Sequence, residues 1–210
     1  VPPVTNGDAS ITGDVLVIIT LNKDAGGTIQ SASTEFDYTL SGVPATDMII
    51  LSHVHNAAAG ANGPVRIDSG ITPATALTPT NGTVTFSKSG INTSPSVAAD
   101  LLANPSNYYF NVHSNVNTGG AARGQLEVAP LIANVVTQGK NLVVTGTGFG
   151  VGARILVNGT LVNVTKQPKG DSTTLIGKKA AKPIASGQTV LVQVQLADGA
   201  KGPGVHFMKP

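Results

Sequence analysis

The sequence contains no cysteine and no tryptophan, and only 11% of its residues are charged. Without cysteine, the chain has neither disulfides nor thiolate metal sites. The charged share is about half the usual one, and the shortage of Glu and Lys argues against long helices. The longest apolar run, residues 15–19, is far too short to cross a bilayer, so we expect no membrane span.

Small and β-branched residues make up most of what is present. Hydrophobic residues account for 40% of the chain, aromatic residues for only 4%, and there are 25 glycines. A composition rich in Val, Ile, Thr, Asn and Gly is typical of an all-β protein. A length of 210 residues suits one large or two small domains. The first residues, VPPVTNG, include neither Met nor a basic or long hydrophobic segment. We expect an exported protein, secreted or at the cell surface, whose signal peptide has been removed.

Short strand patterns run through the first 129 residues. Residues 8–21 predict the first strand, and residues 34–41 alternate apolar and polar side chains, as a half-buried strand does. Residues 94–104 predict the one short helix, because Ser94 can cap it and Pro95 fits its first turn. This spacing indicates an antiparallel β-sandwich or barrel with one short helix.

A domain boundary is expected at Ala129-Pro130, which gives domains of residues 1–129 and 130–210. The second segment contains about seven further strand patterns. Asn158-Gly159 is a strong signal for a two-residue hairpin, and residues 160–165 are expected to form the strand that follows it. This number of strands in about eighty residues is typical of an immunoglobulin-like sandwich.

The two segments carry opposite net charges. Residues 1–129 have four Lys/Arg and nine Asp/Glu, a net −5, whereas residues 130–210 have nine and two, a net +7, which together give the overall +2. No aromatic residues are interleaved with the lysines, so we expect no nucleic-acid partner. Opposite signs favour contact between the halves or between copies of the chain. The alternative is two solvated surfaces with no shared role.

Three of the four histidines lie in two short segments, at His53, His55 and His113. Side chains at i and i+2 of a strand point to the same face, so His53 and His55 would stand side by side. If the strand of His113 is adjacent, three imidazoles converge and could bind one copper or zinc ion. Asp68 could add an oxygen ligand or accept a bond from an imidazole. The alternative is that the histidines only hydrogen-bond loops.

The remaining polar residues carry no recognisable catalytic motif. Arg123 could pair with Asp68 or Asp47, or brace a loop carbonyl. His206 lies near the C-terminus, outside the histidine-rich segments. The sequence contains no G-x-S-x-G, H-E-x-x-H or P-loop pattern, and this favours a protein without enzymatic activity.

Two blocks of the first segment resemble the CHRD domain, a module first described in chordin and widespread in secreted bacterial proteins. The resemblance covers about residues 9–129. The residues that carry it are His53-Val54-His55, Gly60, Asn62-Gly63-Pro64-Val65, Tyr109, Asn111-Val112-His113 and Arg123-Gly124-Gln125-Leu126. The stretch just before Arg123 departs from the family, whose members more often carry an acidic and an apolar residue there.

The second segment resembles an IPT/TIG immunoglobulin-like domain, over about residues 130–208. The matching residues are Pro130, Ile132, residues 142–149, Val157-Asn158-Gly159 and Thr173-Thr174-Leu175. Such domains are usually spacers or binding modules of extracellular proteins, and neither resemblance implies an enzyme.

Two functional hypotheses follow. The first is a secreted, non-enzymatic surface or matrix protein that contacts other proteins or copies of itself, in one version as a filament. The second is an extracellular copper- or zinc-binding protein that uses His53, His55 and His113, in one version with redox activity.

Overall fold

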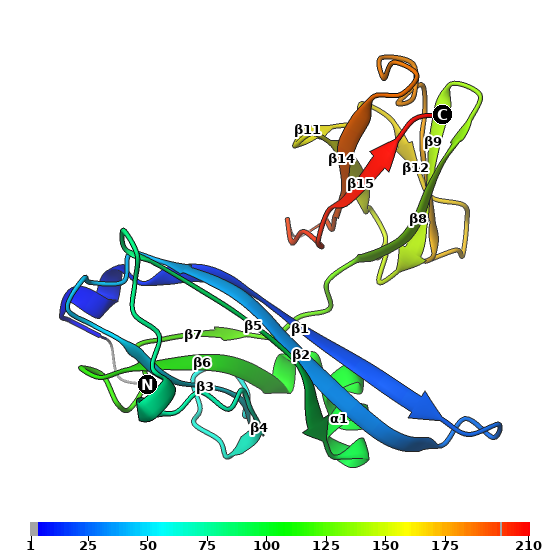
Figure 1. Cartoon of the computed structure of the whole chain (residues 1–210). Coiled ribbons are helices and arrows are strands. Elements are labelled where there is room, and N and C mark those ends of the chain that lie inside the picture. Colours follow the sequence, from blue (N-terminus) through cyan, green and yellow to red (C-terminus); the bar gives the residue numbers. More distant parts are fainter. Residues whose placement is uncertain (1–3, 198) are drawn as a thin grey trace. The chain divides into compact units, whose positions relative to one another are not determined.

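The computed structural model describes residues 4–197 and 199–210. The chain forms two compact units, Val1–Glu127 and Val128–Pro210 (Figure 1). Each unit has a hydrophobic core of its own. Nearly all of the regular structure is antiparallel sheet, which confirms the predicted all-β class.

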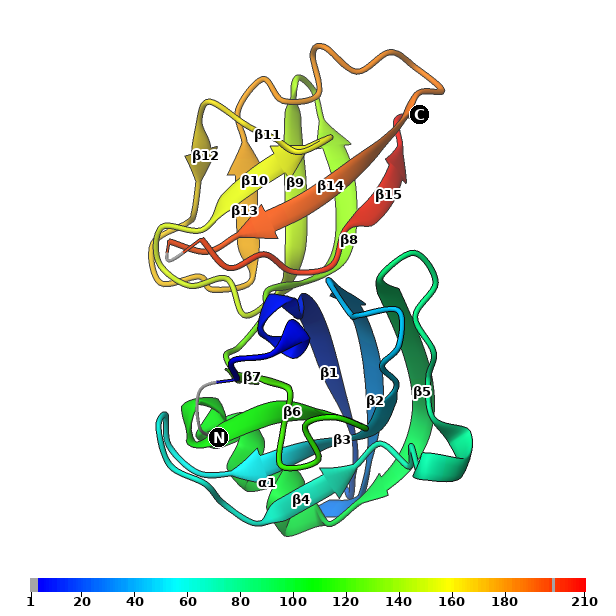
Figure 2. The ribbon, with the colours of Figure 1, turned by 90° about the vertical axis from the view of Figure 1, so that its left-hand side faces the viewer.

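Two sheets of unit 1 pack against each other. The first has the strand order β1-β2-β5, with β1 (Thr12–Lys23), β2 (Ile29–Ser41) and β5 (Thr83–Thr93). The second has the order β4-β3-β6-β7, with β4 (Val65–Asp68), β3 (Ile49–Asn56), β6 (Tyr108–Ser114) and β7 (Ala122–Gln125). Figure 2 shows both sheets, with the α-helix α1 (Pro95–Ala103) beside them.

The core between these sheets is aromatic at its centre. The ring of Phe110 on β6 lies 5.9 Å from that of Phe36 and 5.3 Å from that of Tyr38, both on β2. Tyr38 and Phe36 are almost fully buried. Most of the chain's few aromatic residues lie in this core or pack against it. Their packing holds one face of the second sheet against the first.

Unit 2 is a sandwich of two four-stranded sheets around a separate core that includes Leu142, Ile155, Leu175 and Val192. One sheet has the order β12-β13-β9-β8 and the other the order β11-β10-β14-β15. The strands are β8 (Leu131–Gln138), β9 (Asn141–Thr147), β10 (Arg154–Val157), β11 (Thr160–Leu161), β12 (Thr165–Lys166), β13 (Thr174–Gly177), β14 (Thr189–Gln195) and β15 (Val205–Met208).

Several predicted elements differ in detail. The first strand was predicted from residue 8, but Gly7–Ser10 form a 3-10 helix, η1, whose Asn6 side chain accepts from the Asp8 amide. Two further 3-10 helices are η2 (Pro73–Thr75) and η3 (Pro105–Asn107). The strand predicted at residues 160–165 is wrong as one element, because β11 and β12 belong to different sheets.

The predicted hairpin at Asn158-Gly159 is confirmed. Both residues have positive φ, 49° and 77°, as the tight turn that joins antiparallel strands of right-handed twist requires. The helix predicted over residues 94–104 is also confirmed, as α1 with Pro95 at its first position. The expected cap is not formed, because the Ser94 side chain makes no capping hydrogen bond and instead pairs with the Ser96 hydroxyl.

Burial of Tyr38 predicts a loss of stability in alkali. Desolvation raises the pKa of its hydroxyl to about 12, against the ordinary value of 10.0. As the pH rises, the Tyr38 hydroxyl loses its proton in the unfolded chain before it does so in the folded one. The buried hydroxyl therefore stabilises the folded state fully below pH 10, and this stabilisation is lost as the pH rises towards 12. At roughly 1.4 kcal/mol per pKa unit, the loss reaches about 3 kcal/mol.

Denaturant unfolding of the wild type and a Tyr38→Phe variant at several pH values tests this expectation. The variant should lose less stability than the wild type between pH 10 and pH 12. Equal slopes for the two proteins would show that the Tyr38 hydroxyl does not titrate in this way.

Candidate metal centre

The outer face of the second sheet of unit 1 carries the candidate site. Strand residues alternate between the two faces of a sheet, and Val54, Phe110 and Val112 point into the core. Their neighbours in the strands, among them His53 and His55 on β3, therefore share the opposite face. The same rule places Asn111 and His113 of β6 on that face, because β6 pairs antiparallel with β3.

The structure brings the three predicted histidines together. One ring nitrogen of each lies within 4.8 Å of those of the other two, and the ring centroids of His53 and His113 are 5.2 Å apart. The residues are only 7%, 9% and 8% exposed, in the order His53, His55, His113. Three imidazoles from two adjacent strands, β3 and β6, thus converge at one nearly buried point.

One nitrogen of each ring faces an oxygen atom, which accepts a hydrogen bond from His55 and from His113. His55 donates from Nδ1 to the carbonyl of Gly63 at 2.9 Å, and His113 donates from Nδ1 to the carbonyl of Thr118 at 2.7 Å. Because a carbonyl only accepts, these bonds place the proton on Nδ1 and leave the Nε2 lone pair free. His53 Nε2 faces the carboxylate of Asp68 at 3.8 Å. Such outer partners orient imidazoles as metal ligands.

Of the remaining three ring nitrogens, His113 Nε2 lies 3.2 Å from the Asn111 side-chain amide, and the other two have no partner in the part of the chain that the structure describes. His53 Nδ1 and His55 Nε2 are buried and make no hydrogen bond with any described residue. Leaving a buried polar atom unpaired costs about 1–3 kcal/mol. Two buried, unpaired nitrogens on rings that converge with a third imidazole are what a metal site without its ion would contain.

Burial keeps two of these rings neutral. It is the main cause that lowers the pKa of His53, against the opposing attraction of Asp68. Burial also lowers the pKa of His55, against the opposing hydrogen bond to Gly63. Metal ions bind the neutral imidazole, so the environment favours the form that can coordinate.

The family comparison bears on this unit directly. The family model of the CHRD domain matches residues 1–126, which is more than half of the chain. The chain belongs to the CHRD domain family. CHRD domains occur in extracellular proteins and serve in protein interactions. A search of curated proteins found no match.

A stack of side chains supports His55 in the CHRD domain. Its ring lies parallel to that of Tyr109, with centroids 4.7 Å apart, and the guanidinium of Arg123 lies 4.3 Å from the Tyr109 centroid. Arg123 Nη1 also donates to the carbonyl of Ala61 at 3.1 Å. Of the alternatives predicted for Arg123, the structure therefore shows the one that braces a loop carbonyl.

Residues 57–64 form a loop that is fixed to this face at several points. The Gln125 amide donates to the carbonyl of Ala57 at 2.8 Å, and the Gly63 amide donates to the Tyr109 hydroxyl at 3.3 Å. A Cβ on Gly63 would lie 1.9 Å from the carbonyl oxygen of Asn56. The sequence did not reveal that Tyr109 and Gly63 support His55 and this loop. For Tyr109 a signal was present, because residues 109 and 113 of one strand point to the same face.

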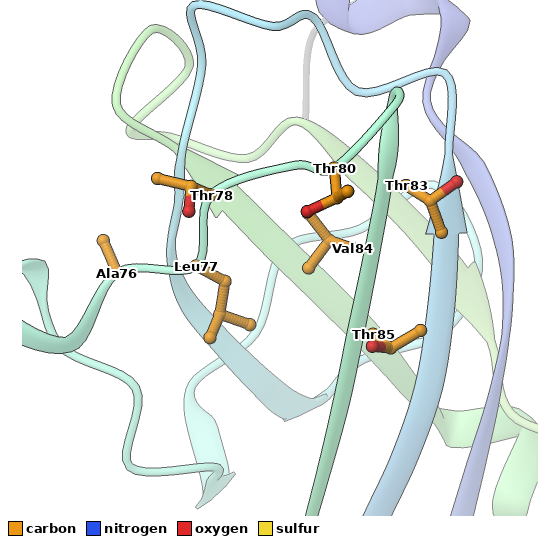
Figure 3. A pocket seen from close by; sticks show the side chains of 7 residues that line it. All are labelled: Ala76, Leu77, Thr78, Thr80, Thr83, Val84 and Thr85. Carbon is orange, nitrogen blue, oxygen red and sulfur yellow. The ribbon is translucent and has the colours of Figure 1, made fainter.

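Other candidate residues of the sequence lie elsewhere. His206 is on β15 of unit 2, outside the CHRD domain. Asp68 faces Nε2 of His53 and is not part of the cluster of His53, His55 and His113. A pocket of about 410 Å³ lies between the loop after η2 and the start of β5 (Figure 3). It is lined by Ala76, Leu77, Thr78, Thr80, Thr83, Val84 and Thr85, none of which titrates near neutral pH.

No helix among the described residues is long and apolar enough to span a membrane.

Proposed function

We propose that the CHRD domain of this extracellular protein binds one copper or zinc ion through His53, His55 and His113. The observation that supports this most is the pair of buried ring nitrogens, His53 Nδ1 and His55 Nε2, that lack a hydrogen-bond partner within the described residues. A hydrogen-bonding role for the histidines explains the outer nitrogens but leaves these inner ones unpaired. A bound cation accounts for both the oriented outer nitrogens and the unpaired inner ones, because the inner nitrogens would be its ligands.

The ligand chemistry selects the metal. Three neutral imidazoles suit Cu(II) and Zn(II), and copper leads in raw affinity. A tetrahedral ion with bonds of about 2.0–2.1 Å needs nitrogens roughly 3.4 Å apart. The present separations of up to 4.8 Å require the rings to close by about an ångström, which side-chain rotation can supply. With an open coordination position, a copper ion could support redox chemistry; a closed site would add stability.

Calorimetric titration of purified, chelator-treated protein tests this proposal. The wild type should bind one Zn²⁺ or Cu²⁺ per chain, and a His53→Ala/His55→Ala variant should bind at least 100-fold more weakly, because two of three ligands are gone. His206→Ala is the matched control and should bind like the wild type. Unchanged affinity in the double variant would rule the site out.

A second candidate function, contact with other proteins or with further copies of the chain, is favoured by family membership. CHRD is a protein-interaction domain, and we propose that residues 130–210 form an IPT/TIG-like immunoglobulin-fold domain of the kind used as a spacer or binding module. The two-sheet sandwich of unit 2 and its Asn158-Gly159 hairpin support this assignment.

Charged surfaces offer a route to contact between copies. At one end of unit 2, the Ala181 amide donates to the carbonyl of Lys140, and the Lys179 amide donates to the Asn141 side chain. These bonds draw together four exposed lysines, at positions 140, 178, 179 and 182. In unit 1, the outer face of β1 and β2 carries Asp14, Glu35 and Asp37, in alternation with core-facing residues. Surfaces of opposite sign attract one another.

Sedimentation at increasing protein concentration tests self-association. We expect oligomers at low ionic strength that dissociate when salt screens the charges, and a Lys178→Glu/Lys179→Glu variant should remain monomeric. Lys201→Glu, near the opposite end of β14, is the control. A wild type that stays strictly monomeric at high concentration and low salt would exclude the filament.

A further inference from the structure

We infer that Asn111 supplies the fourth ligand of the metal site through its side-chain oxygen. The inference rests on the proposed metal-binding function and adds a residue that the three-histidine cluster does not include. It is carried by the register of the sheet, by the hydrogen bond of the Asn111 amide and by one further buried atom without a partner.

The register puts Asn111 at the centre of the site. Asn111 is directly opposite His53 in the β3–β6 pairing and opposite Arg123 in the β6–β7 pairing. It also precedes His113 by two residues on the same strand, so both side chains point to the same face. Directly opposite residues on a sheet have Cβ atoms about 4.5–5.5 Å apart. An ion between the three imidazoles would therefore lie above the Asn111 side chain.

The hydrogen bonding of Asn111 is incomplete. Its Nδ2 donates to His113 Nε2 at 3.2 Å, a nitrogen that can accept because Nδ1 of the same ring donates to Thr118. Its Oδ1 is buried and has no partner among the described residues, and the residue is only 2% exposed. Of the four buried side-chain atoms without a partner in the described part of the chain, three belong to this one site.

Metal binding would reverse the orientation of this amide. An ion takes the His113 lone pair, so the Asn111 NH₂ group loses its acceptor and would stand beside a cation. A half-turn about the terminal torsion of the side chain exchanges the two amide atoms and points Oδ1 at the ion. This one rotation satisfies the unpaired oxygen and completes a set of three nitrogens and one oxygen, without movement of the backbone.

This fourth ligand has a consequence for metal choice. A neutral amide oxygen is a hard donor that suits divalent ions, whereas Cu(I) prefers soft sulfur ligands, which this site lacks. The site should therefore prefer Zn²⁺ and Cu²⁺ to Cu⁺, and its affinity for divalent ions should depend on residue 111.

Titration of the full chain with Zn²⁺ and Co²⁺ tests the assignment. Asn111→Asp puts a charged oxygen in the same position and should bind Zn²⁺ at least tenfold more tightly than the wild type. Asn111→Leu should bind at least tenfold more weakly, and the visible absorption of its Co²⁺ complex should differ because a ligand is lost. Asn92→Leu, on β5 of the other sheet, is the control and should match the wild type in both measurements.

The outcomes separate this inference from the metal-binding proposal. If the wild type binds no metal, the proposed function fails and the inference fails with it. If the wild type binds one ion but Asn111→Asp and Asn111→Leu match its affinity and spectrum, the three-histidine site stands and the role of Asn111 is refuted. If Asn111→Leu does not fold, the zinc affinity of Asn111→Asp, expected to be at least tenfold tighter than that of the wild type, still tests whether residue 111 is a ligand.

Discussion

Replacing Gly63 with alanine is expected to destabilise the CHRD domain by about 3 kcal/mol, in the range for steric overlap in a packed region. The added Cβ would lie 1.9 Å from the backbone oxygen of Asn56 and 2.6 Å from its carbonyl carbon. Neither atom can rotate away as a side chain could, so the loop itself must move. The Gly63 carbonyl, which holds His55 Nδ1 at 2.9 Å, would move with it.

The same substitution should therefore weaken metal binding as well as folding. Loss of an outer partner of a metal-bound histidine typically costs 10–100-fold in affinity, and we expect at least a tenfold loss for Gly63→Ala. Denaturant unfolding and zinc titration measure the two effects. Gly124→Ala is the matched control, because a Cβ there meets no atom within 4 Å. A Gly63→Ala protein as stable as this control would show that the loop is not held as the structure describes.

Saturating zinc is expected to raise the stability of unit 1 by about 4 kcal/mol when its free concentration is 1,000 times the dissociation constant. An ion that binds only the folded site adds its binding free energy to folding. Unit 2 has its own core and contains none of the three histidines, so its unfolding provides an internal reference. Thermal unfolding with and without zinc measures both transitions.

The stabilisation should vanish in a His113→Ala variant and should be reversed by a chelator. His113 lies on β6, away from the His53 and His55 pair in sequence, and its loss leaves two ligands that sit on one strand. An equal rise in melting temperature for the wild type and His113→Ala would mean that zinc acts elsewhere on the chain.

Strand periodicity explains why much of the fold could be predicted. The alternation over residues 34–41 matches the burial of Phe36, Tyr38 and Leu40, because only one face of that strand meets the core. The two-residue spacing of His53 and His55 likewise placed both rings on one face. The prediction that His113 lies near this pair depended only on its strand being adjacent to that of His53 and His55. The structure shows this, because β6 pairs with β3.

The rest depended on register and on contacts between segments distant in sequence. Asn111 shares a face with His113 by the same spacing rule, but its position opposite His53 follows only from the pairing of β3 with β6. The need for glycine at position 63 arises from the close approach of the Asn56 backbone, which no local pattern encodes. The 3-10 helix at Gly7–Ser10 forms where Asp8 is buried against Ser114 and Asn117, more than a hundred residues away.

The metal and contact functions are compatible in one molecule. The histidine site lies on the second sheet of unit 1, whereas Asp14, Glu35 and Asp37 lie on the first. Substitutions at one surface therefore leave the residues of the other in place, and the two functions can be tested independently.

Anomalous diffraction from crystals grown with zinc, recorded at the zinc absorption edge, tests the central claim most directly. We expect one strong peak per chain, about 2.0–2.2 Å from a ring nitrogen of each of His53, His55 and His113, with the Asn111 amide oxygen turned towards it. A protein that crystallises with zinc but shows no peak between these three rings would contradict the account.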